Sequence, residues 1–232
     1  MLKDWNALPE FLRREEIRPY WELLRKKRGQ LLLKRGLDIL LGLLLLVVLC
    51  VPMAVIALAV KAGSPGPVLY RQERVTAYGK RFRIHKFRTM RPDAEKVGTA
   101  VTSGGDPRIT KTGRKLRRLR LDELPQVLDV LAGNMTFVGT RPEAVKYTEK
   151  YAPEWNATLL LPAGITSECS IRYKDEEKLL AEAAKAGGDE VDRVYVEEVL
   201  PEKMKINLES LREFSLGSDL RTLLRTVVAV FR

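Results

Sequence analysis

A long uncharged apolar segment, residues 39–60, dominates the hydrophobic pattern of the chain. It is apolar on every helical face, whereas a helix in the core of a soluble protein usually has one apolar stripe. As a helix, it could just cross a hydrocarbon core about 30 Å thick. Pro52 lies near its middle and disfavours a straight helix, because proline lacks the backbone N–H and clashes with the preceding turn. Two topologies stay open: a Pro-kinked transmembrane helix, or a helix that enters one leaflet, bends at Pro52 and returns.

Basic residues lie on both sides of this segment. Lys34 and Arg35 precede it, and Lys61, Arg71 and Arg74 follow it. A spanning helix usually has its excess of lysine and arginine on one side only. The flanks therefore favour the re-entrant helix and predict that both of its ends face the cytoplasm.

The rest of the pattern predicts an α+β fold. Periodic apolar positions before residue 30 indicate one or two short amphipathic helices, either a packing arm or an interfacial anchor. Residues 68–75 and 81–88 alternate as two strands of a small β-hairpin. Residues 91–108, 138–143 and 162–166 are predicted to be loops or turns, and helical patterns cover residues 112–131, 146–151, 175–186, 191–212 and 219–231. We expect an N-terminal amphipathic segment at 1–33, a Pro-broken membrane helix at 34–62 and a mainly helical cytoplasmic domain at 63–232.

The charge balance indicates an anionic partner. The chain has 41 lysines and arginines against 30 aspartates and glutamates, which suits lipid head groups, phosphates or nucleic acid. Basic residues next to the apolar segment favour a membrane surface, since each contributes on the order of 1 kcal/mol of attraction to an anionic leaflet. These are Arg25, Lys26, Lys27, Arg28, Lys34 and Arg35. A membrane-tethered nucleic-acid binder is a weaker alternative, because the sequence lacks an aromatic stacking platform and a recognisable reading motif.

Cysteine and histidine usage narrows the chemistry. Cys50 and Cys169 are far apart in the sequence, which indicates no disulfide framework and fits a reducing cytoplasm. His85 is the only histidine, so a His-rich zinc site is excluded. A metal would have to be held by carboxylates and substrate oxygens, a ligand set typical of Mg²⁺.

The adjacent carboxylates Asp122 and Glu123 are the leading candidates for chemistry. They follow a strongly basic helical pattern and precede a Leu-Pro pair that favours a helix start. A structural role is open, because carboxylates stabilise the positive end of a helix. Lys86, Arg88 and Arg141 lie in or beside turn-rich segments that could converge on a phosphate, and arginine offers a planar fork suited to phosphate oxygens.

Seven short motifs occur in an order that resembles the bacterial sugar transferases, the monotopic phosphoglycosyl transferases. They are Lys34-Arg35-Gly36-Leu37-Asp38, Ser64-Pro65-Gly66-Pro67-Val68, Arg71-Gln72-Glu73-Arg74-Val75, Lys86-Phe87-Arg88-Thr89-Met90, Asp106-Pro107-Arg108-Ile109-Thr110, Leu121-Asp122-Glu123-Leu124-Pro125-Gln126 and Gly139-Thr140-Arg141-Pro142-Glu143. The resemblance covers the chain from about Lys34 onward.

The resemblance implies an enzyme that moves a sugar phosphate from a UDP-sugar to a polyprenol phosphate, releases UMP and initiates a surface glycan. It implies that Asp122 is the nucleophile of a covalent phosphosugar intermediate and that Glu123 helps to place Mg²⁺. Arg141 would grip a phosphate, with Lys86 and Arg88 in the same pocket. It also implies a site at the cytoplasmic face of the bacterial inner membrane. The oligomeric state stays open, and a homo-oligomer is compatible with the sequence.

The sequence departs from the family pattern at a few positions. Thr140 replaces the commoner proline before the arginine, Asn134 replaces an aspartate, and His85 replaces a tyrosine. Residues 163–167 read Ala-Gly-Ile-Thr-Ser where the family commonly has Pro-Gly-Ile-Thr-Gly. The resemblance implies that this segment touches the nucleotide or sugar. None of these changes removes the carboxylate pair, although a catalytically silent membrane adaptor on the same scaffold stays the alternative.

Overall fold

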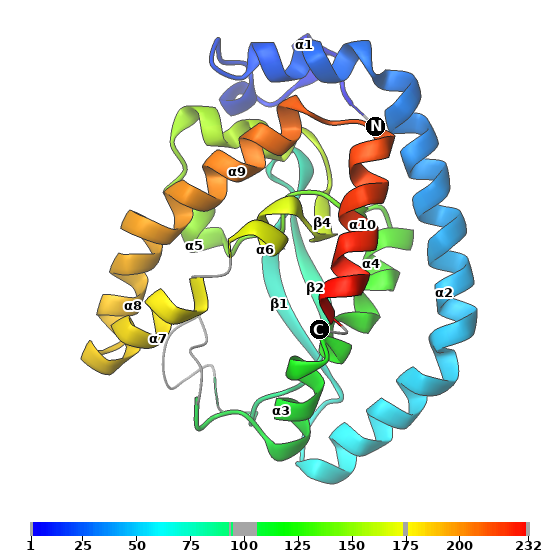
Figure 1. Ribbon diagram of the computed structural model, residues 1–232, viewed down its shortest axis with the longest axis vertical. Coiled ribbons are helices and arrows are strands. Elements are labelled where there is room, and N and C mark those ends of the chain that lie inside the picture. The colour runs from blue at the N-terminus through cyan, green and yellow to red at the C-terminus, as the bar shows by residue number, and fades with distance from the viewer. Residues whose placement is uncertain (1, 93, 95–105, 174–175, 231–232) are drawn as a thin grey trace.

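The computed structural model describes residues 2–92, 94, 106–173 and 176–230. One long helix, α2 (Arg28–Gly63), runs along one side of a mostly helical body that contains two small sheets (Figure 1). The predicted mixture of helices with a small amount of sheet is confirmed. The other α-helices are α1 (Arg18–Lys26), α3 (Lys111–Arg118), α4 (Val127–Leu131), α5 (Val145–Thr148), α6 (Glu168–Arg172), α7 (Glu176–Ala186), α8 (Gly188–Val194), α9 (Leu200–Arg212) and α10 (Leu216–Val230).

Shorter turns of helix connect these elements. The 3₁₀ turns are η1 (Trp5–Ala7), η2 (Glu10–Leu12), η3 (Ala77–Gly79), η5 (Leu121–Gln126) and η6 (Pro153–Leu160), and η7 (Tyr195–Val199) is a π-helical turn. The basic stretch predicted to be helical over 112–131 is therefore three pieces, α3, η5 and α4, rather than one helix. Most of the predicted loop at 91–108 lies outside the described residues.

The predicted β-hairpin is confirmed. Strand β1 (Leu69–Val75) pairs antiparallel with β2 (Arg81–Phe87), and the register places Leu69 opposite Phe87. The reversal uses Tyr78 and Gly79, which both have positive φ angles, 60° and 74°. Burial alternates along β2, with Phe82 and Ile84 in the core, as expected for a strand with one packed face.

A second sheet was missed by the sequence analysis. Strand β3 (Met135–Val138) pairs in parallel with β4 (Ala163–Thr166), so residues 162–166 are not the loop that the pattern predicted. The two segments approach closely here: a Cβ atom on Gly164 of β4 would lie 2.2 Å from the carbonyl oxygen of Gly139, which directly follows β3. Only a glycine fits at that point.

The N-terminal segment packs into the body. Leu12, Ile17 and Leu24 are completely buried, in one cluster with Leu160 of η6 and Leu208 of α9. Of the two readings left open by the sequence, this packing favours an arm that completes the core over an anchor lying free at a membrane interface.

Helix α2 is continuous through Pro52. The chain stays helical from Arg28 to Gly63, so the predicted break at Pro52 is wrong as an interruption of the helix. Figure 1 shows that α2 bends part-way along its length, and a proline inside a helix is a usual cause of such a bend. A re-entrant path through a membrane stays a prediction.

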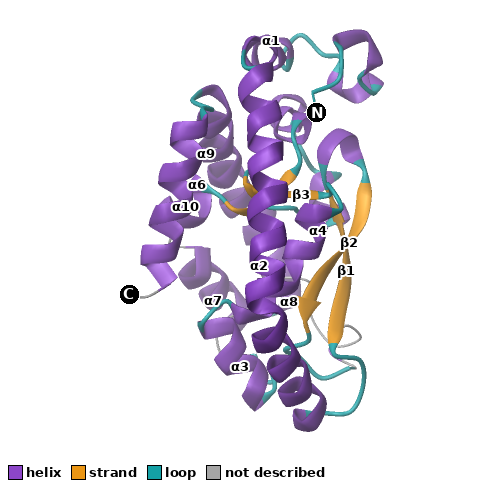
Figure 2. Cartoon of the chain, turned by 90° about the vertical axis from the view of Figure 1, so that its right-hand side faces the viewer, coloured by secondary structure: helices purple, strands orange, loops and turns teal. Residues whose placement is uncertain are grey.

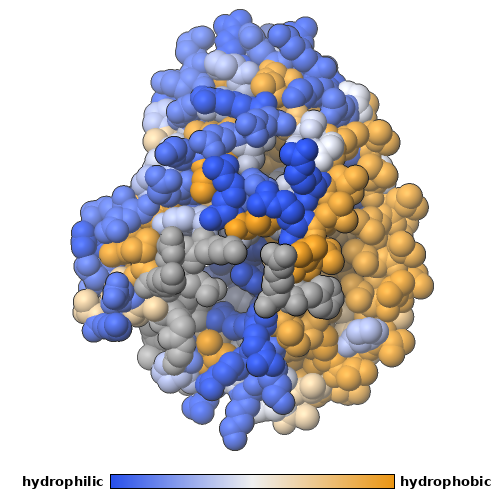
Figure 3. Space-filling view, viewed as in Figure 1, coloured by the Kyte–Doolittle hydropathy of each residue, from blue (hydrophilic) through white to orange (hydrophobic). Residues whose placement is uncertain are grey.

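The outer side of α2 is a broad apolar surface, visible along one edge of the molecule in Figure 3. Its side chains are more than half exposed, which is unusual for so many large aliphatic residues. They include Leu40, Leu44, Val47, Val48, Val51, Val55 and Leu58. Within the described residues, α2 is the one helix long and apolar enough to cross a membrane.

The charged residues before the apolar surface attach α2 to the body, between α10 and α4 (Figure 2). Lys34 Nζ lies 2.9 Å from the carbonyl oxygen of Val138 and 2.5 Å from an Asp219 carboxylate oxygen. Arg35 donates to the last carbonyls of α4, as basic side chains commonly do at a helix C-terminus. Asp38 is buried and accepts hydrogen bonds from β3. These charges therefore have structural partners in addition to any role at a membrane surface.

Candidate active site

The carboxylate pair lies on a sharp turn between the basic helix α3 and the mainly apolar helix α4. Helix α3 ends at Arg118, and Arg120 takes a left-handed conformation (φ 54°) that redirects the chain into η5. A left-handed conformation is unfavourable for a residue with a side chain, so the turn is held by its surroundings. Asp122 and Glu123 follow at once in the first turn of η5, and both are buried.

Glu123 is held by two cationic side chains from other parts of the chain. Lys86 Nζ of β2 lies 2.9 Å from Glu123 Oε1. Arg141, which follows β3, places Nη2 2.6 Å from Oε1 and Nη1 3.1 Å from Oε2. Nη1 also donates to the carbonyl oxygen of Ile165 in β4. The structure therefore brings together three of the five predicted site residues, with Asp122 next to them.

The charges around Glu123 determine its ionisation. Burial raises the pKa of its carboxyl group, but the positive charges of Arg141 and Lys86 outweigh burial and hold that pKa well below its ordinary value. Burial likewise lowers the pKa of Lys86, which Glu123 opposes. The result is one carboxylate between two cations, and both cations are side chains suited to phosphate.

Asp122 has a different environment from its neighbour. Its buried oxygen Oδ1 has no hydrogen-bond partner among the residues that the structure describes. Burial and the adjacent negative charge of Glu123 raise the pKa of Asp122, while Lys86 and Arg117 lower it. Two adjacent carboxyl groups with pKa values shifted in opposite directions are typical of a catalytic pair.

Arg117 of α3 belongs to the same charged environment, which the sequence analysis missed. It donates from Nε to the Thr89 hydroxyl at 3.1 Å, and its charge interacts with Asp122. In the sequence, the arginines of α3 form one strongly basic helical pattern. Nothing in that pattern separated Arg117 from its neighbours, because its contact with the site depends on how α3 packs.

Arg88 lies elsewhere. It is buried, and its terminal nitrogens donate to the carbonyl oxygens of Pro65 and Ser64, each at 2.8 Å. A Cβ atom on Gly66 would lie 2.3 Å from Arg88 Nη1, so this glycine makes room for the guanidinium. Arg88 therefore fastens the turn after α2, and the prediction that it shares the phosphate pocket is not supported by its position.

His85, next to Lys86, is paired with a buried aspartate. Its backbone N–H donates to one oxygen of Asp129 of α4, and its ring Nδ1 lies 2.8 Å from the other. Asp129 is completely buried. This pair fixes β2 against α4 and so sets the position from which Lys86 reaches Glu123.

The site residues fit a magnesium ion shared with a substrate. Among the described residues no group of three or more potential metal ligands occurs. Mg²⁺ often takes only one or two carboxylates and completes its shell with phosphate oxygens and water. Among the described residues, Glu123 Oε2 accepts one hydrogen bond, from Arg141 at 3.1 Å, which leaves it a lone pair for such an ion.

Sequence comparisons give the family to which the chain is similar. A family model described as bacterial sugar transferase matches residues 29–232. The chain is 38% identical over 205 residues to a UDP-glucose:undecaprenyl-phosphate glucose-1-phosphate transferase of Escherichia coli, covering 86% of this chain and 40% of that protein. It is 42% identical over 132 residues to a putative undecaprenyl-phosphate N-acetylgalactosaminyl 1-phosphate transferase of Bacillus subtilis, covering 57% of this chain and 74% of the relative. The chain thus spans less than half of the E. coli protein.

Proposed function

Because the chain belongs to the bacterial sugar transferase family, we propose that it transfers a sugar 1-phosphate from a UDP-sugar to a membrane polyprenol phosphate and releases UMP. The names of the E. coli and B. subtilis relatives support both the type of donor and undecaprenyl phosphate as the acceptor. A relative from Rhizobium leguminosarum named an exopolysaccharide production protein supports a role in starting a surface glycan.

The observation that carries the proposal is the contrast between Asp122 and Glu123. Glu123 is ionised, and Lys86 and Arg141 bind both of its oxygens, so it is a weaker nucleophile than an unpaired carboxylate. Asp122 Oδ1 has no partner within the described structure, so an ionised Asp122 has an oxygen available as a nucleophile.

In the first half-reaction Asp122 Oδ1 attacks the sugar-bearing phosphorus of the donor. A bond forms between this oxygen and phosphorus, and the bridge between the two phosphates breaks with its electrons leaving on UMP. The sugar phosphate stays on Asp122 as an acyl phosphate. Lys86 and Arg141 stabilise the developing negative charge through hydrogen bonds that a preorganised site strengthens.

In the second half-reaction an oxygen of the polyprenol phosphate attacks the same phosphorus. The bond to Asp122 breaks, the carboxylate is regenerated, and the product is a polyprenol diphosphate sugar. Dividing the exchange into two displacements at one carboxylate replaces one difficult step by two easier ones. Mg²⁺, held by Glu123 and substrate oxygens, would neutralise phosphate charge when bound.

The apolar surface of α2 supports a membrane location for this reaction. We place the protein on the cytoplasmic face of the bacterial inner membrane with α2 re-entrant in one leaflet. An acceptor with a polyprenol tail keeps its phosphate at the interface, and a helix buried beside the site holds the enzyme at the same depth.

Intact-protein mass spectrometry tests the intermediate. The full-length protein, incubated with Mg²⁺ and a panel of UDP-sugars without acceptor, is expected to gain the mass of one sugar phosphate and to release up to one equivalent of UMP. Asp122→Asn should lose both the adduct and turnover, because its amide lacks the attacking anionic oxygen. Glu123→Gln should weaken Mg²⁺-dependent turnover.

Two results would contradict the proposal. An adduct mapped to another residue, or robust turnover by Asp122→Asn, would remove Asp122 as the nucleophile. Absence of UMP release from every UDP-sugar in the presence of polyprenol phosphate would favour the alternative, a catalytically silent membrane adaptor on the same scaffold.

A further inference from the structure

A second recess lies beside the candidate active site. It is a cavity of about 170 Å³ between α6, α9 and α10. Val138, Gly139 and Thr140 line it at the carboxyl end of β3, and Ser167 lines it at the carboxyl end of β4. Ligands of parallel sheets commonly bind beyond the carboxyl ends of the strands.

Asn207 of α9 gives this cavity a polar group without a partner. The residue is only 5% exposed, and it lines the cavity. Its side chain makes no hydrogen bond to any part of the chain that the structure describes, although an amide offers two donors and an acceptor. The two amide atoms are not among the buried unpaired side-chain atoms of the described residues, so they reach open space in the cavity, where a ligand can pair with them.

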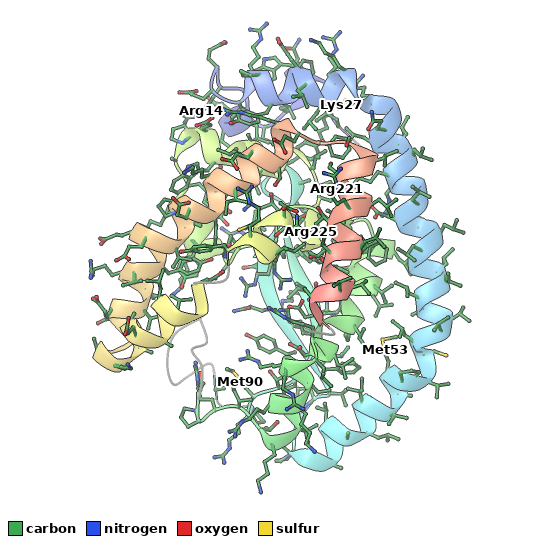
Figure 4. The ribbon with its side chains drawn as sticks, viewed as in Figure 1. Arg14, Lys27, Met53, Met90, Arg221 and Arg225 are labelled. Atoms are coloured by element: carbon green, nitrogen blue, oxygen red, sulfur yellow. The ribbon has the colours of Figure 1, made fainter. Side chains whose placement is uncertain are left out.

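The other walls suit a flat ring. Leu211 and Phe214 provide apolar surface. Arg221 and Arg225 project from α10 toward α6 (Figure 4), and Arg225 is paired with Glu168 at 2.6 Å. Arg221 has no ion pair within the described ranges, so its planar guanidinium is available to stack on a base, as arginines do in nucleotide sites.

The cavity and the carboxylate site share one stretch of backbone. Thr140, a wall of the cavity, is followed directly by Arg141, whose guanidinium binds Glu123. On the other strand, Ser167 lies two residues after Ile165, whose carbonyl oxygen accepts from Arg141. A nucleotide with its phosphates at Arg141 would therefore have this recess within reach of its base.

We infer that this cavity holds the nucleobase of the donor nucleotide and that Asn207 reads the edge of that base. The side-by-side donor and acceptor of an amide match the neighbouring C=O and N–H groups of uracil. The inference rests on the proposed function for the identity of the nucleotide, but the binding it describes can be measured without turnover.

The test uses the full-length protein in nanodiscs, with UMP and CMP as probes in separate titrations. Asn207→Leu removes the amide, and Asn207→Asp keeps its shape but removes the N–H donors. The matched control is Asn156→Asp, since the Asn156 amide bonds only carbonyls at the start of its own 3₁₀ turn.

We expect UMP affinity to fall about tenfold or more in both Asn207 variants and to stay unchanged in the control. The preference for UMP over CMP should fall in Asn207→Asp, because a carboxylate accepts from the cytosine amino group.

Kinetics and folding give independent readings. With a UDP-sugar that the enzyme accepts, the Asn207 variants should raise KM with little change in kcat, as expected for binding lost equally from ground and transition states. Unchanged thermal unfolding midpoints would show that the fold is intact. If UMP binds Asn207→Leu as tightly as the original chain, the inference is wrong, whatever the enzyme's activity.

Two further outcomes separate the inference from the proposed function. UMP binding that depends on Asn207, without UMP release from any UDP-sugar, would uphold the cavity and refute the transferase. Unchanged UMP affinity together with weaker binding to phosphatidylglycerol vesicles would assign the cavity to a lipid head group and overturn the inference.

Discussion

Arg141 contacts Glu123 through both of its terminal nitrogens, a geometry that a single ammonium group cannot reproduce. We therefore expect Arg141→Lys to lower turnover roughly ten- to hundredfold, the equivalent of one charged hydrogen bond of about 1.5–3 kcal/mol. Membrane association, measured by flotation with vesicles, should stay normal. Arg18→Lys is the matched control, because Arg18 contacts exposed glutamates near it in sequence and the ring of Trp5 in the N-terminal segment. Near-normal turnover of Arg141→Lys would show that a point charge is sufficient.

The raised pKa of Asp122 predicts a pH dependence with a defined direction. Attack needs the ionised carboxylate, so adduct formation should fall as the pH drops through a pKa higher than that of an ordinary aspartate. Removing the negative charge of Glu123 by Glu123→Gln lowers the pKa of Asp122 and should move this acid limb to lower pH. Removing the positive charge of Lys86 by Lys86→Met should move it to higher pH.

Single-turnover rates of adduct formation, measured across pH for both variants, check this prediction. Shifts in the same direction for the two variants would contradict the arrangement of charges around Asp122.

At the residue scale, the sequence predicted most of the side chains that meet at the site. It did not predict which groups each of them contacts. Asp122, Glu123, Lys86 and Arg141 come together as expected. Arg88 does not, because the carbonyl groups of Ser64 and Pro65 after α2 bind its guanidinium. Motif membership shows that a residue matters but not which group it contacts, since contacts over long sequence separations depend on packing.

At the scale of elements, Asp38 is the point at which α2 is fixed to β3. Its carboxylate accepts from the Thr136 hydroxyl at 2.7 Å and from the Phe137 N–H at 3.3 Å. Asp38→Ala leaves both buried donors unpaired, and we expect it to lower the free energy of unfolding by about 2–4 kcal/mol. Asp4→Ala, which removes an exposed pair with Arg28, should change it by less than about 1 kcal/mol.

Denaturant unfolding in a mild detergent, followed by tryptophan fluorescence, checks this difference. Equal stability of the two variants would show that Asp38 does not hold α2 on the body.

The elements that the sequence predicted well are those with local pairing. The β1–β2 hairpin has an alternating pattern and a Gly-containing turn within one short stretch, so its register follows from adjacent residues. The β3–β4 pair was missed, because four-residue parallel strands carry no turn signal and pair across a connection of more than twenty residues. Pro52 does not end the helix, since a bent helix tolerates a proline that a straight one does not.

At the scale of the whole molecule, both ends of α2 contact the same body. The N-terminal part binds Val138 through Lys34, and the C-terminal turn binds Arg88 through Ser64. A helix that crossed a bilayer would separate its two ends onto opposite sides. This arrangement supports the re-entrant path and a cytoplasmic location for both ends.

Cysteine labelling in intact cells tests that topology. In a chain with Cys50 and Cys169 replaced by serine, Gly29→Cys and Lys61→Cys place single thiols near the two ends of α2, and a Cβ at position 29 meets open space. We expect neither thiol to react with an impermeant maleimide from outside, and both to react in inverted membrane vesicles. Labelling of either one from outside would establish a spanning helix.

The attachment of α2 at both ends also has a practical consequence for purification. In many membrane-anchored enzymes a soluble fragment can be obtained by cutting away the anchor. Here Asp38 pairs with β3 and Lys34 with α10, so removing the helix would also remove part of the interior of the body. A fragment that begins after Gly63 is expected to aggregate, whereas exchanging the exposed leucines and valines of α2 for polar residues would keep those interior contacts and offers the better route to a water-soluble form.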